Sequence, residues 1–369
     1  MKRNRRQILA ASAIGASALI TRNRANAAQI TNSQAIQRIA FGSCAKQDKE
    51  QPIWDAIAAT NPDIFLFIGD NIYADTRDPQ VMRDKYAMLA AKPQFKRFRE
   101  KVPFLTMWDD HDYGEDDAGQ EYPMKEESRK QFCDFWNVAQ GSPRRTRPDG
   151  IYTAQIFGPT GRKVQIILPD LRYNRTPIRK LDLGGKDYRN WAREQNEAGR
   201  AVPGPYERNP DDGATMLGEA QWQWLEYQLS QPAEVRILAS SLQVVADFAG
   251  WEGWINYAND HQRLISAIRS KRASGLICVS GDTHYGEISR LNANVPYPLW
   301  DITSSGITEV WPVTPPNSRR IGEVYRERNF GLIEINWAAN SIETKICGED
   351  GSVKLRQIIP IASLRVPRF

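Results

Sequence analysis

Residues 64–73 read IFLFIGDNIY, and this stretch decides the fold class. Five consecutive apolar residues, Ile64–Ile68, are typical of a strand that is buried on both faces of a sheet. Gly69 and Asp70 follow at once, which predicts a turn directly after the strand. A strand covered on both faces needs a packed layer on each side, so the run predicts a layered α/β protein.

Strands and helices alternate on both sides of this run. The expected strands are Arg38–Phe41, Phe104–Trp108, Tyr152–Phe157, Lys163–Leu168, Arg236–Ser240, Leu276–Val279, Leu299–Ile302, Phe330–Trp337, Ser341–Cys347 and Leu355–Ile359. The expected helices are Pro52–Ala59, Pro79–Arg99 despite Pro93, Met124–Val138, Leu217–Leu229 and Asp260–Lys271. An early βαβ region followed by a strand-rich C-terminal third predicts two packed sheets flanked by helices.

The composition is that of an ordinary globular protein. Apolar residues make up 41% of the 369 residues and charged residues 25%, which excludes a disordered chain, a collagen and a polytopic membrane protein. The net charge of +5 comes from the N-terminus, because residues 1–27 hold six of the 49 basic residues and no acid. The other 43 basic residues face 44 acids, so the composition gives no support for nucleic-acid binding.

Residues 1–27 are predicted to be an export signal. The basic start MKRNRR precedes the apolar run Ile8–Ile20 and the cleavage pattern Ala25-Asn26-Ala27. The run is shorter than the roughly 20 residues that span a membrane. Arg5-Arg6 resembles a twin-arginine signal, so we expect export of the folded chain by the twin-arginine machinery to the periplasm or the outside. The mature form then has no transmembrane anchor; an uncleaved basic anchor is the alternative.

Four polar motifs come directly after predicted strands. They are FGSC (41–44), GDNIY (69–73), WDDHD (108–112) and SGDTH (280–284). Ligand sites of α/β sheets form beyond the carboxyl ends of the strands, so we expect the four motifs to converge. Each motif alone also fits a simpler interpretation, namely a turn with an aspartate cap, a solvated acidic corner or a buried cysteine.

A metal centre is the economical explanation of the four motifs together. Carboxylates that are crowded at one place repel one another unless a cation neutralises them. The chain has only three histidines, and two of them, His111 and His284, lie in these motifs, which excludes an all-histidine zinc site. Carboxylate oxygens favour Ca²⁺, Mg²⁺ or Mn²⁺, whereas a tyrosine phenolate with a thiolate favours iron. The residues lead to the hypothesis of a centre with two different metals.

The sequence resembles the alkaline phosphatase D (PhoD-like) family of the metallophosphatase superfamily. The matching segments, in the family's order, are FGSC (41–44), IGDNIYAD (68–75), WDDHDYGEDDAG (108–119), PDLRYNR (169–175), TMLGEAQWQWLEYQL (215–229), SSLQVV (240–245), WEGW (251–254) and SGDTHYGEIS (280–289). The resemblance implies that residues 28–369 form one domain, a four-layer α/β/β/α metallophosphatase sandwich of two mixed sheets flanked by helices. It also implies the short form, without the N-terminal β-sandwich domain of full-length members.

The same resemblance implies a ligand set. Iron, as Fe³⁺, is expected at Cys44, Asp70, Tyr73 and His284. Calcium is expected at the bridging Asp70 and at Asp282, Asp110 and Asp116, with Mg²⁺, Mn²⁺ or Zn²⁺ as alternatives. Asp282 stands where related metallophosphatases have a histidine, and its hard oxygen agrees with calcium. Asp116 stands where many relatives have asparagine, which adds a negative charge at that position.

The predicted chemistry is phosphoric ester hydrolysis, as in an alkaline phosphatase or phosphodiesterase. A hydroxide held between the two metals is expected to attack phosphorus in line. His111 is expected to protonate the leaving oxygen or to stabilise the transition state. Arg172 is expected to pair with the non-bridging phosphate oxygens, and an ion pair with Asp170 is the alternative.

Two further features bear on the substrate. The irregular stretch Tyr173–Met216 carries many basic residues and is expected to frame the site with a positive rim. Trp251, Trp254, Trp300 and Trp311 fit either an apolar wall that favours a diester or a lipid, or ordinary core packing.

Other functions stay open from the sequence. A non-catalytic periplasmic protein that binds metal or phosphate has the same ligand chemistry, and a phospholipase-type phosphodiesterase has the same reaction. Carbohydrate binding through exposed aromatic residues has no motif in its favour.

Overall fold

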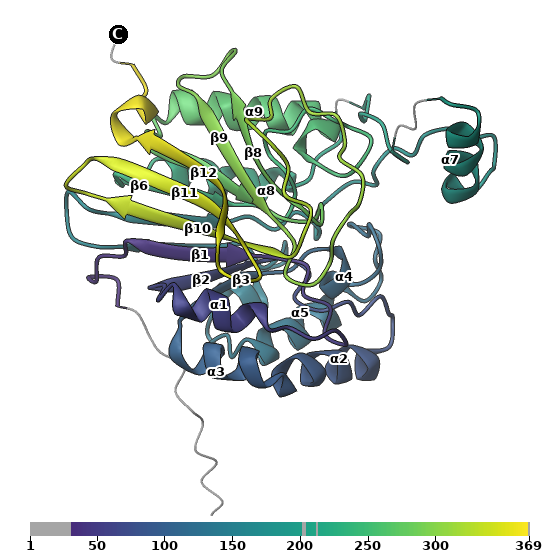
Figure 1. Cartoon of the computed structure of the whole chain (residues 1–369), viewed down its shortest axis with the longest axis horizontal. Helices are drawn as coiled ribbons and strands as arrows, with labels where there is room; N and C mark the ends of the chain where they lie inside the picture. The colour runs from purple at the N-terminus through teal and green to yellow at the C-terminus, as the bar shows by residue number, and fades with distance from the viewer. Residues whose placement is uncertain (1–30, 201–203, 212, 368–369) are drawn as a thin grey trace, which may run out of the picture.

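The structure, a computed structural model, describes residues 31–200, 204–211 and 213–367. Two six-stranded mixed sheets form its centre (Figure 1). The first sheet has the order β12-β11-β10-β1-β2-β3, with β1 Arg38–Gly42, β2 Ile64–Ile68, β3 Phe104–Met107, β10 Asn329–Asn336, β11 Ser341–Gly348 and β12 Val353–Pro360. The second has the order β4-β5-β6-β7-β9-β8, with β4 Thr153–Phe157, β5 Val164–Leu168, β6 Val235–Ala239, β7 Leu276–Ser280, β8 Gly286–Leu291 and β9 Leu299–Ser304. The predicted signal, residues 1–27, lies outside the described residues.

Helices cover the outer face of each sheet (Figure 1). The first sheet packs against α1 (Ile53–Ala59), α2 (Pro79–Ala91), α3 (Pro93–Lys101) and α5 (Lys125–Phe135). The second packs against α8 (Gly218–Leu229) and α9 (Ala258–Ser270). The smaller elements are α4 (Asp110–Tyr113), α6 (Pro143–Thr146), α7 (Tyr188–Glu197) and the 3₁₀ turns Trp254–Asn256 and Ile361–Leu364. The predicted four-layer α/β/β/α sandwich is confirmed.

Strand β2 shows how the sequence produces these layers. Its five residues are all buried, and successive side chains point to opposite faces. Ile64, Leu66 and Ile68 join the core between the two sheets. Phe65 and Phe67 join the outer core, where their rings contact Trp54 of α1 at centroid distances of 5.3 and 5.7 Å. A continuous apolar run is therefore needed at this position.

The parallel strands of both sheets bring their carboxyl ends to one place. β1, β2 and β3 are parallel neighbours in the first sheet, and β5, β6 and β7 are parallel neighbours in the second. Between the loops after these strands, the Ser241 hydroxyl donates to Asp109 at 2.7 Å and the Gly281 N–H donates to the Ser241 carbonyl at 3.1 Å. The polar motifs of two different sheets thus share one edge of the molecule.

The boundaries differ from prediction in two informative places. The predicted helix Pro79–Arg99 is wrong as one element, because Lys92 has an extended ψ of 119° and separates α2 from α3. A residue before proline avoids the helical region, and Pro93 imposes that break. Strand β8 was not predicted, because its residues include Glu287 and Arg290 and lack an apolar pattern. Burial of Glu287 is made possible by its 2.6 Å ion pair with Arg320.

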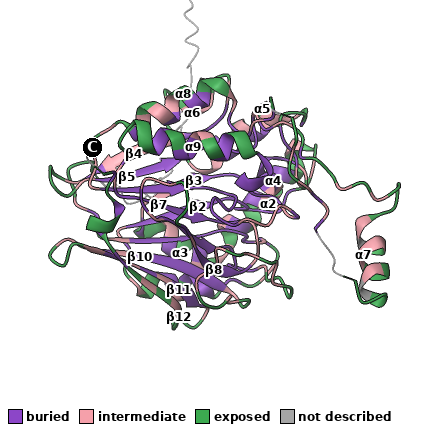
Figure 2. Cartoon of the chain, turned by 90° about the horizontal axis from the view of Figure 1, so that it is seen from above, coloured by how far each residue is buried: buried purple, intermediate pink, exposed green. Residues whose placement is uncertain are grey.

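The stretch Tyr173–Met216 is not irregular throughout, because it contains α7. No described side chain of α7 is buried, and Figures 1 and 2 show the helix set apart from the sandwich. The predicted positive rim is partly neutralised. Arg179 pairs with Glu207, and Lys186 pairs with Glu194 at 2.6 Å.

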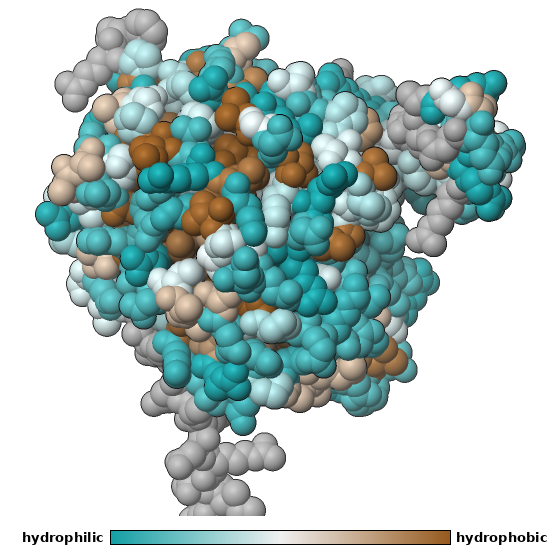
Figure 3. Space-filling model, viewed as in Figure 1, coloured by the Kyte–Doolittle hydropathy of each residue, from teal (hydrophilic) through white to brown (hydrophobic). Residues whose placement is uncertain are grey.

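One face of the molecule is mainly polar. Figure 3 shows a face covered mostly by hydrophilic residues, with smaller groups of hydrophobic residues between them. None of the helices in the described part of the chain is long and apolar enough to cross a membrane. The four cysteines are buried and free.

We predict that Trp54→Ala lowers the free energy of unfolding by about 3–5 kcal/mol, because it empties a fully buried aromatic site between α1 and β2. Urea denaturation measures this loss. The matched control is Tyr227→Ala on α8, whose side chain is 62% exposed and whose loss should cost less than about 0.5 kcal/mol. Equal effects of the two substitutions would contradict the assignment of Trp54 to a core.

Candidate metal centre

The four motifs converge beyond the carboxyl ends of the strands, as predicted. Cys44 follows β1, Asp70 follows β2 and Asp110 follows β3, all in the first sheet. Asp282 and His284 follow β7 in the second sheet. The Ala45 N–H donates to the Asp70 carbonyl at 3.0 Å, which holds the first two loops together. The centre is therefore assembled between the two sheets.

The backbone at the predicted ligands is strained. Cys44, Asp70, Asp282 and His284 have φ values of 63°, 46°, 71° and 61°, in the left-handed region that residues other than glycine rarely adopt. Such residues persist only where the surrounding structure holds them, and they gather at functional sites. Here the left-handed turns end the strands abruptly and aim the side chains at one point.

Gly69 permits the close approach of two of these loops. Its φ is 108°, and a Cβ at this position would lie 2.7 Å from the Cβ of Asp109. Any larger residue would push the loop after β2 away from the loop after β3. The glycine is thus required for Asp70 to reach the acids of the third motif.

The predicted iron ligands lie together. Sγ of Cys44 is 3.4 Å from a carboxylate oxygen of Asp70, and the Tyr73 hydroxyl is 3.0 Å from Nε2 of His284. Ligand atoms of Cys44, Asp70 and His284 all lie within 4.8 Å of one another. This group offers one thiolate, one carboxylate, one phenol and one imidazole to a cation.

A second group is built from carboxylates. Asp109, Asp110 and Asp282 have ligand atoms within 4.8 Å of one another, and so do Asp70, Asp110 and His111. Asp70 therefore lies in the group of Cys44 and His284 and also in a group with Asp110, which links it to the carboxylates. Asp109 was not among the predicted ligands. Its position directly before Asp110, at the end of a strand, is the sequence feature that could have identified it.

The acids after α4 include one residue that was not predicted. Asp110, Asp116 and Asp117 form a further group within 4.8 Å, at the outer side of the centre. The side chain of Asp116 is 80% exposed. Asp117, which the sequence reasoning missed, lies closer in, and its N–H donates to Asp110 at 2.8 Å.

Unpartnered oxygens indicate that the site fits cations. Oδ1 of Asp70, Oδ2 of Asp109 and Oδ1 of Asp110 are buried and have no hydrogen-bond partner. A buried carboxylate oxygen without a partner is costly, unless a cation takes the place of the missing donor. The residues present therefore fit bound cations.

The electrostatics of the centre support the same conclusion. Burial, together with the neighbouring acids, raises the pKa of Asp70 and of Asp282 well above the usual carboxyl value. Burial also raises the pKa of the Cys44 thiol. Burial lowers the pKa of His284 to about 4, so this imidazole is neutral and able to act as a ligand. A bound cation would favour the ionised forms of the acids and the thiol.

His111 lies beside the carboxylate group. Its Nδ1 is 2.7 Å from Asp75, and its Nε2 is 3.9 Å from Asp110. The ring also lies against Tyr73, with centroids 4.1 Å apart. Burial lowers its pKa, but the charges of Asp110 and Asp70 and the hydrogen bond that the ring donates to Asp75 outweigh burial and raise the pKa to about 12. Asp75 thus fixes one nitrogen of His111 and leaves the other facing the centre.

Arg172 is fully buried beneath the carboxylate group. Its guanidinium pairs with Asp109, lies 3.5 Å from Asp110 and lies 2.7 Å from Glu252. Asp170 instead accepts a hydrogen bond from the backbone N–H of Arg172 at 3.0 Å, so the alternative ion pair with Asp170 is wrong. Glu252 also pairs with the buried Arg175. Nη1 of Arg172 has no hydrogen-bond partner.

The four tryptophans considered from the sequence separate into two pairs. Trp254 and Trp300 are buried in the core around the second sheet. Trp311 is exposed, and its backbone N–H donates to the backbone carbonyl of His284 at 2.9 Å. Trp251 is half-buried and contacts the ring of Trp311.

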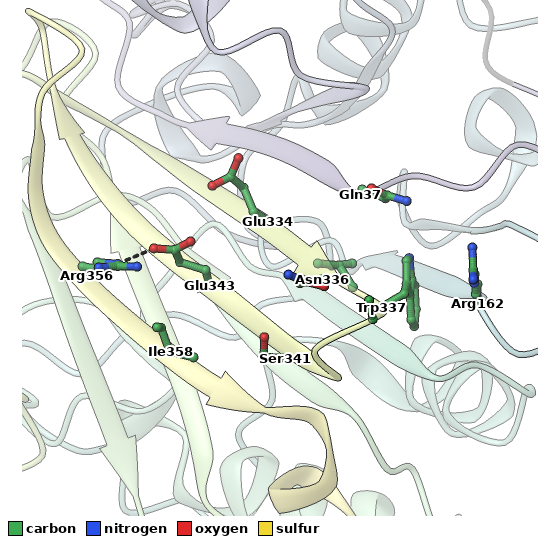
Figure 4. A pocket seen from close by; sticks show the side chains of 11 residues that line it. Gln37, Arg162, Glu334, Asn336, Trp337, Ser341, Glu343, Arg356 and Ile358 are labelled. Carbon is green, nitrogen blue, oxygen red and sulfur yellow. Dashed lines mark hydrogen bonds and ion pairs between the residues drawn. The ribbon is translucent and has the colours of Figure 1, made fainter.

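A pocket elsewhere on the surface is distinct from the metal centre (Figure 4). Its volume is about 640 Å³, and it lies along β10, β11 and β12 of the first sheet. None of the four motifs contributes to its lining. Glu334 in this pocket pairs with Arg38, and Glu343 pairs with Arg356, so both acids of the pocket already have a cationic partner.

Comparison with known proteins decides the family. The family described as PhoD-like phosphatase matches residues 39–329 of this chain. The chain belongs to the PhoD-like phosphatase family. Alkaline phosphatase D of Bacillus subtilis (strain 168) is 25% identical to it over 290 residues, which cover 69% of this chain and 47% of that protein. The chain thus spans about half the length of this PhoD-like relative.

Solved structures support the fold of this PhoD-like chain. The structure titled "Structure of PhoD" superposes with a TM-score of 0.66 at 15% identity, over 89% of this chain and 69% of that one. The structure titled "GAP50 the anchor in the inner membrane complex of Plasmodium" superposes with a TM-score of 0.53 at 13% identity, over 91% and 90% of the two chains. Both are like this chain in fold.

We predict that Asp70→Asn abolishes binding at both metal positions, because Asp70 lies in a ligand group with Cys44 and His284 and in another with Asp110. Cys44→Ala and His284→Ala should remove the metal of the first group and leave the second partly occupied. Elemental analysis of the purified proteins measures both contents. Asp55→Asn, at an acid of α1 that is 58% exposed, is the control and should keep the wild-type contents. Full metal content in Asp70→Asn would contradict a shared ligand.

We predict that cation affinity rises with pH and that binding releases protons. Burial raises the pKa of Asp70, Asp282 and Cys44, so protons and cations compete for these groups, and the proton is favoured as pH falls. Calorimetric titration of the metal-free protein in two buffers with different ionisation enthalpies counts the protons released. Binding that releases no protons and does not change with pH would contradict this electrostatic description.

Proposed function

We propose that this chain hydrolyses phosphoric esters at the metal centre, by in-line attack of water on phosphorus. The observation that carries the proposal is the position of Asp70, which belongs both to the group with Cys44 and His284 and to the group with Asp110. A shared carboxylate between two ligand groups is the arrangement of binuclear hydrolases. Membership of the PhoD-like phosphatase family supports the same reaction class.

The proposed ligands differ between the two positions. Iron is assigned to Cys44, Asp70, Tyr73 and His284, since a thiolate and a phenolate favour that metal. Calcium, with Mg²⁺, Mn²⁺ or Zn²⁺ as alternatives, is assigned to Asp70, Asp110 and Asp282, with Asp109 as an added ligand and Asp116 at the edge. When bound, the two cations stabilise the charge on the phosphate oxygens and lower the pKa of the attacking water.

His111 is the proposed proton donor to the leaving oxygen. Asp75 holds its Nδ1 at 2.7 Å, which leaves Nε2 directed toward Asp110 and the reacting atoms. The three nearby carboxylates favour the protonated imidazolium, and this is the form that a general acid needs. Stabilisation of the transition-state charge by the same imidazolium is the alternative role.

Arg172 has two proposed roles. Its Nε and Nη2 hold Asp109 and Asp110, and thereby orient two of the carboxylates that face the metals. Its unpartnered Nη1 is the group proposed to pair with a non-bridging phosphate oxygen. Removal of Arg172 would therefore disturb both metal binding and phosphate binding.

Three classes of phosphoric ester are candidate substrates. Phosphomonoesters, phosphodiesters and phospholipids all present a phosphorus atom with an ester oxygen to the same centre. A non-catalytic role as a metal- or phosphate-binding protein is the second candidate, since the unpartnered carboxylate oxygens of Asp70, Asp109 and Asp110 would hold cations with or without turnover. The position of His111 beside Asp110 favours turnover over binding alone.

We also propose that the chain is exported by the twin-arginine machinery to the periplasm or beyond. The basic start, the apolar run and the small-residue pattern in residues 1–27 support this. That route carries folded proteins, so the metals can be inserted before export.

The proposal predicts that metal-loaded protein releases phosphate from at least one of three classes, namely monoesters, diesters and phospholipids. His111→Asn should lower kcat by about a hundredfold or more, because a positioned proton donor is lost, while metal content stays unchanged. Steady-state kinetics at saturating metal measure the first effect, and elemental analysis measures the second.

Asp55→Asn again serves as the control, because this exposed acid lies on α1, away from the centre. Full occupancy of both metal positions with no turnover of any ester would overturn the proposal and favour the binding protein. Unchanged kcat in His111→Asn would remove only the role of this histidine.

A further inference from the structure

A row of four aromatic rings leads from the metal centre to α7. Trp311 contacts Trp251, Trp251 contacts Tyr188, and Tyr188 contacts Trp191, with ring centroids 5.6, 5.9 and 6.1 Å apart. We call Trp311, Trp251, Tyr188 and Trp191 the aromatic row. It crosses three segments that are distant in the sequence, and two of them adjoin residues of the centre.

The near end of the aromatic row is fixed to the metal centre. The backbone N–H of Trp311 donates to the carbonyl of His284 at 2.9 Å. Three residues earlier, the backbone N–H of Thr308 donates to the carbonyl of Cys44 at 3.0 Å. Trp251 precedes Glu252, whose carboxylate lies 2.7 Å from the guanidinium of Arg172. The residues that place the proposed ligands therefore also place these two indole rings.

The apolar surface at this end is open to water. Trp311 is 37% exposed, and the neighbouring Val310 and Val313 are 45% and 61% exposed. Isolated exposed apolar residues are common, but here three of them lie within four residues of the chain, in the segment that is bonded to His284, and their exposed area gains free energy when an apolar group covers it. Attachment of α7 explains the positions of Tyr188 and Trp191. It leaves the exposure of Trp311 unexplained, because this ring lies at the opposite end of the aromatic row, and it leaves Val310 and Val313 of the same segment unexplained too.

Building on the proposed function, we propose that Trp311, Trp251 and Val313 bind an aromatic ester group of the substrate. The preferred substrate class is then a phosphate ester with an aromatic group, rather than one with a small alkyl or polar group. Indole rings bind flat apolar groups through both area and ring contacts, and they hold their shape without a ligand. The phosphorus would lie at the metal centre and the aromatic group along the near end of the aromatic row.

The test compares two inert ligands, phenylphosphonate and methylphosphonate, which differ only in the organic group and have no ester bond to cleave. Binding to metal-loaded protein is measured by calorimetry, and inhibition of ester hydrolysis is measured in parallel. Wild type should bind phenylphosphonate about tenfold more tightly than methylphosphonate. Trp311→Ala should remove most of this difference through loss of phenylphosphonate affinity, with less than about a twofold change for methylphosphonate.

Two further variants distinguish loss of the binding surface from a folding defect in Trp311→Ala. Trp311→Phe should restore most of the preference, because a flat ring is retained. Val313→Ser, at a side chain that is 61% exposed, should lower phenylphosphonate affinity by about two- to threefold without affecting the fold. The control is Tyr227→Ala, an exposed aromatic residue of α8 outside the aromatic row, which should change neither affinity.

The outcomes separate this inference from the proposed function. If wild type binds both phosphonates equally, or if Trp311→Ala weakens both to the same extent, the aromatic subsite is wrong while ester hydrolysis stands. If metal-loaded wild type binds neither phosphonate and hydrolyses no ester, the proposed function itself is wrong. A preference that Trp311→Ala removes and Trp311→Phe restores supports the inference.

Discussion

Repulsion between buried carboxylates is the constraint on which the rest of this structure depends. Asp70, Asp109 and Asp110 are buried within a few residues of two strand ends, and Asp282 joins them from the other sheet. Positive charge must compensate them, and Arg172 supplies part of it through Asp109 and Asp110. The unpartnered oxygens of Asp70, Asp109 and Asp110 require more, which bound cations would provide.

The packing of two sheets against each other brings these charged residues together. Neither sheet holds the complete set, because Cys44 and Asp70 follow strands of the first sheet, whereas Asp282 and His284 follow a strand of the second. Packing of β2 on both faces fixes the distance between the layers, and left-handed turns aim the ligands across the gap. Metal binding would therefore stabilise the contact between the two sheets as well as the site.

The sequence predicts the layers and the meeting of the motifs, because both depend on local patterns. The apolar run Ile64–Ile68, which a turn signal follows, predicts a strand buried on both faces, and polar residues after parallel strands share one edge. Partners between distant segments were not predictable: Arg172 pairs with Glu252 rather than with Asp170, and Asp109 belongs to the carboxylate group. Helix α7 was missed because, with no buried side chain among those described, it has no core-facing apolar pattern to reveal it.

The most direct test of this account is an anomalous X-ray diffraction measurement on crystals of metal-loaded protein, with data on both sides of the iron absorption edge. The account predicts two peaks that share Asp70 as a ligand. The one near Cys44, Tyr73 and His284 should change across the iron edge, and the one near Asp110 and Asp282 should not. A single peak, or two peaks without Asp70 between them, would contradict the shared-ligand centre from which the proposed chemistry follows.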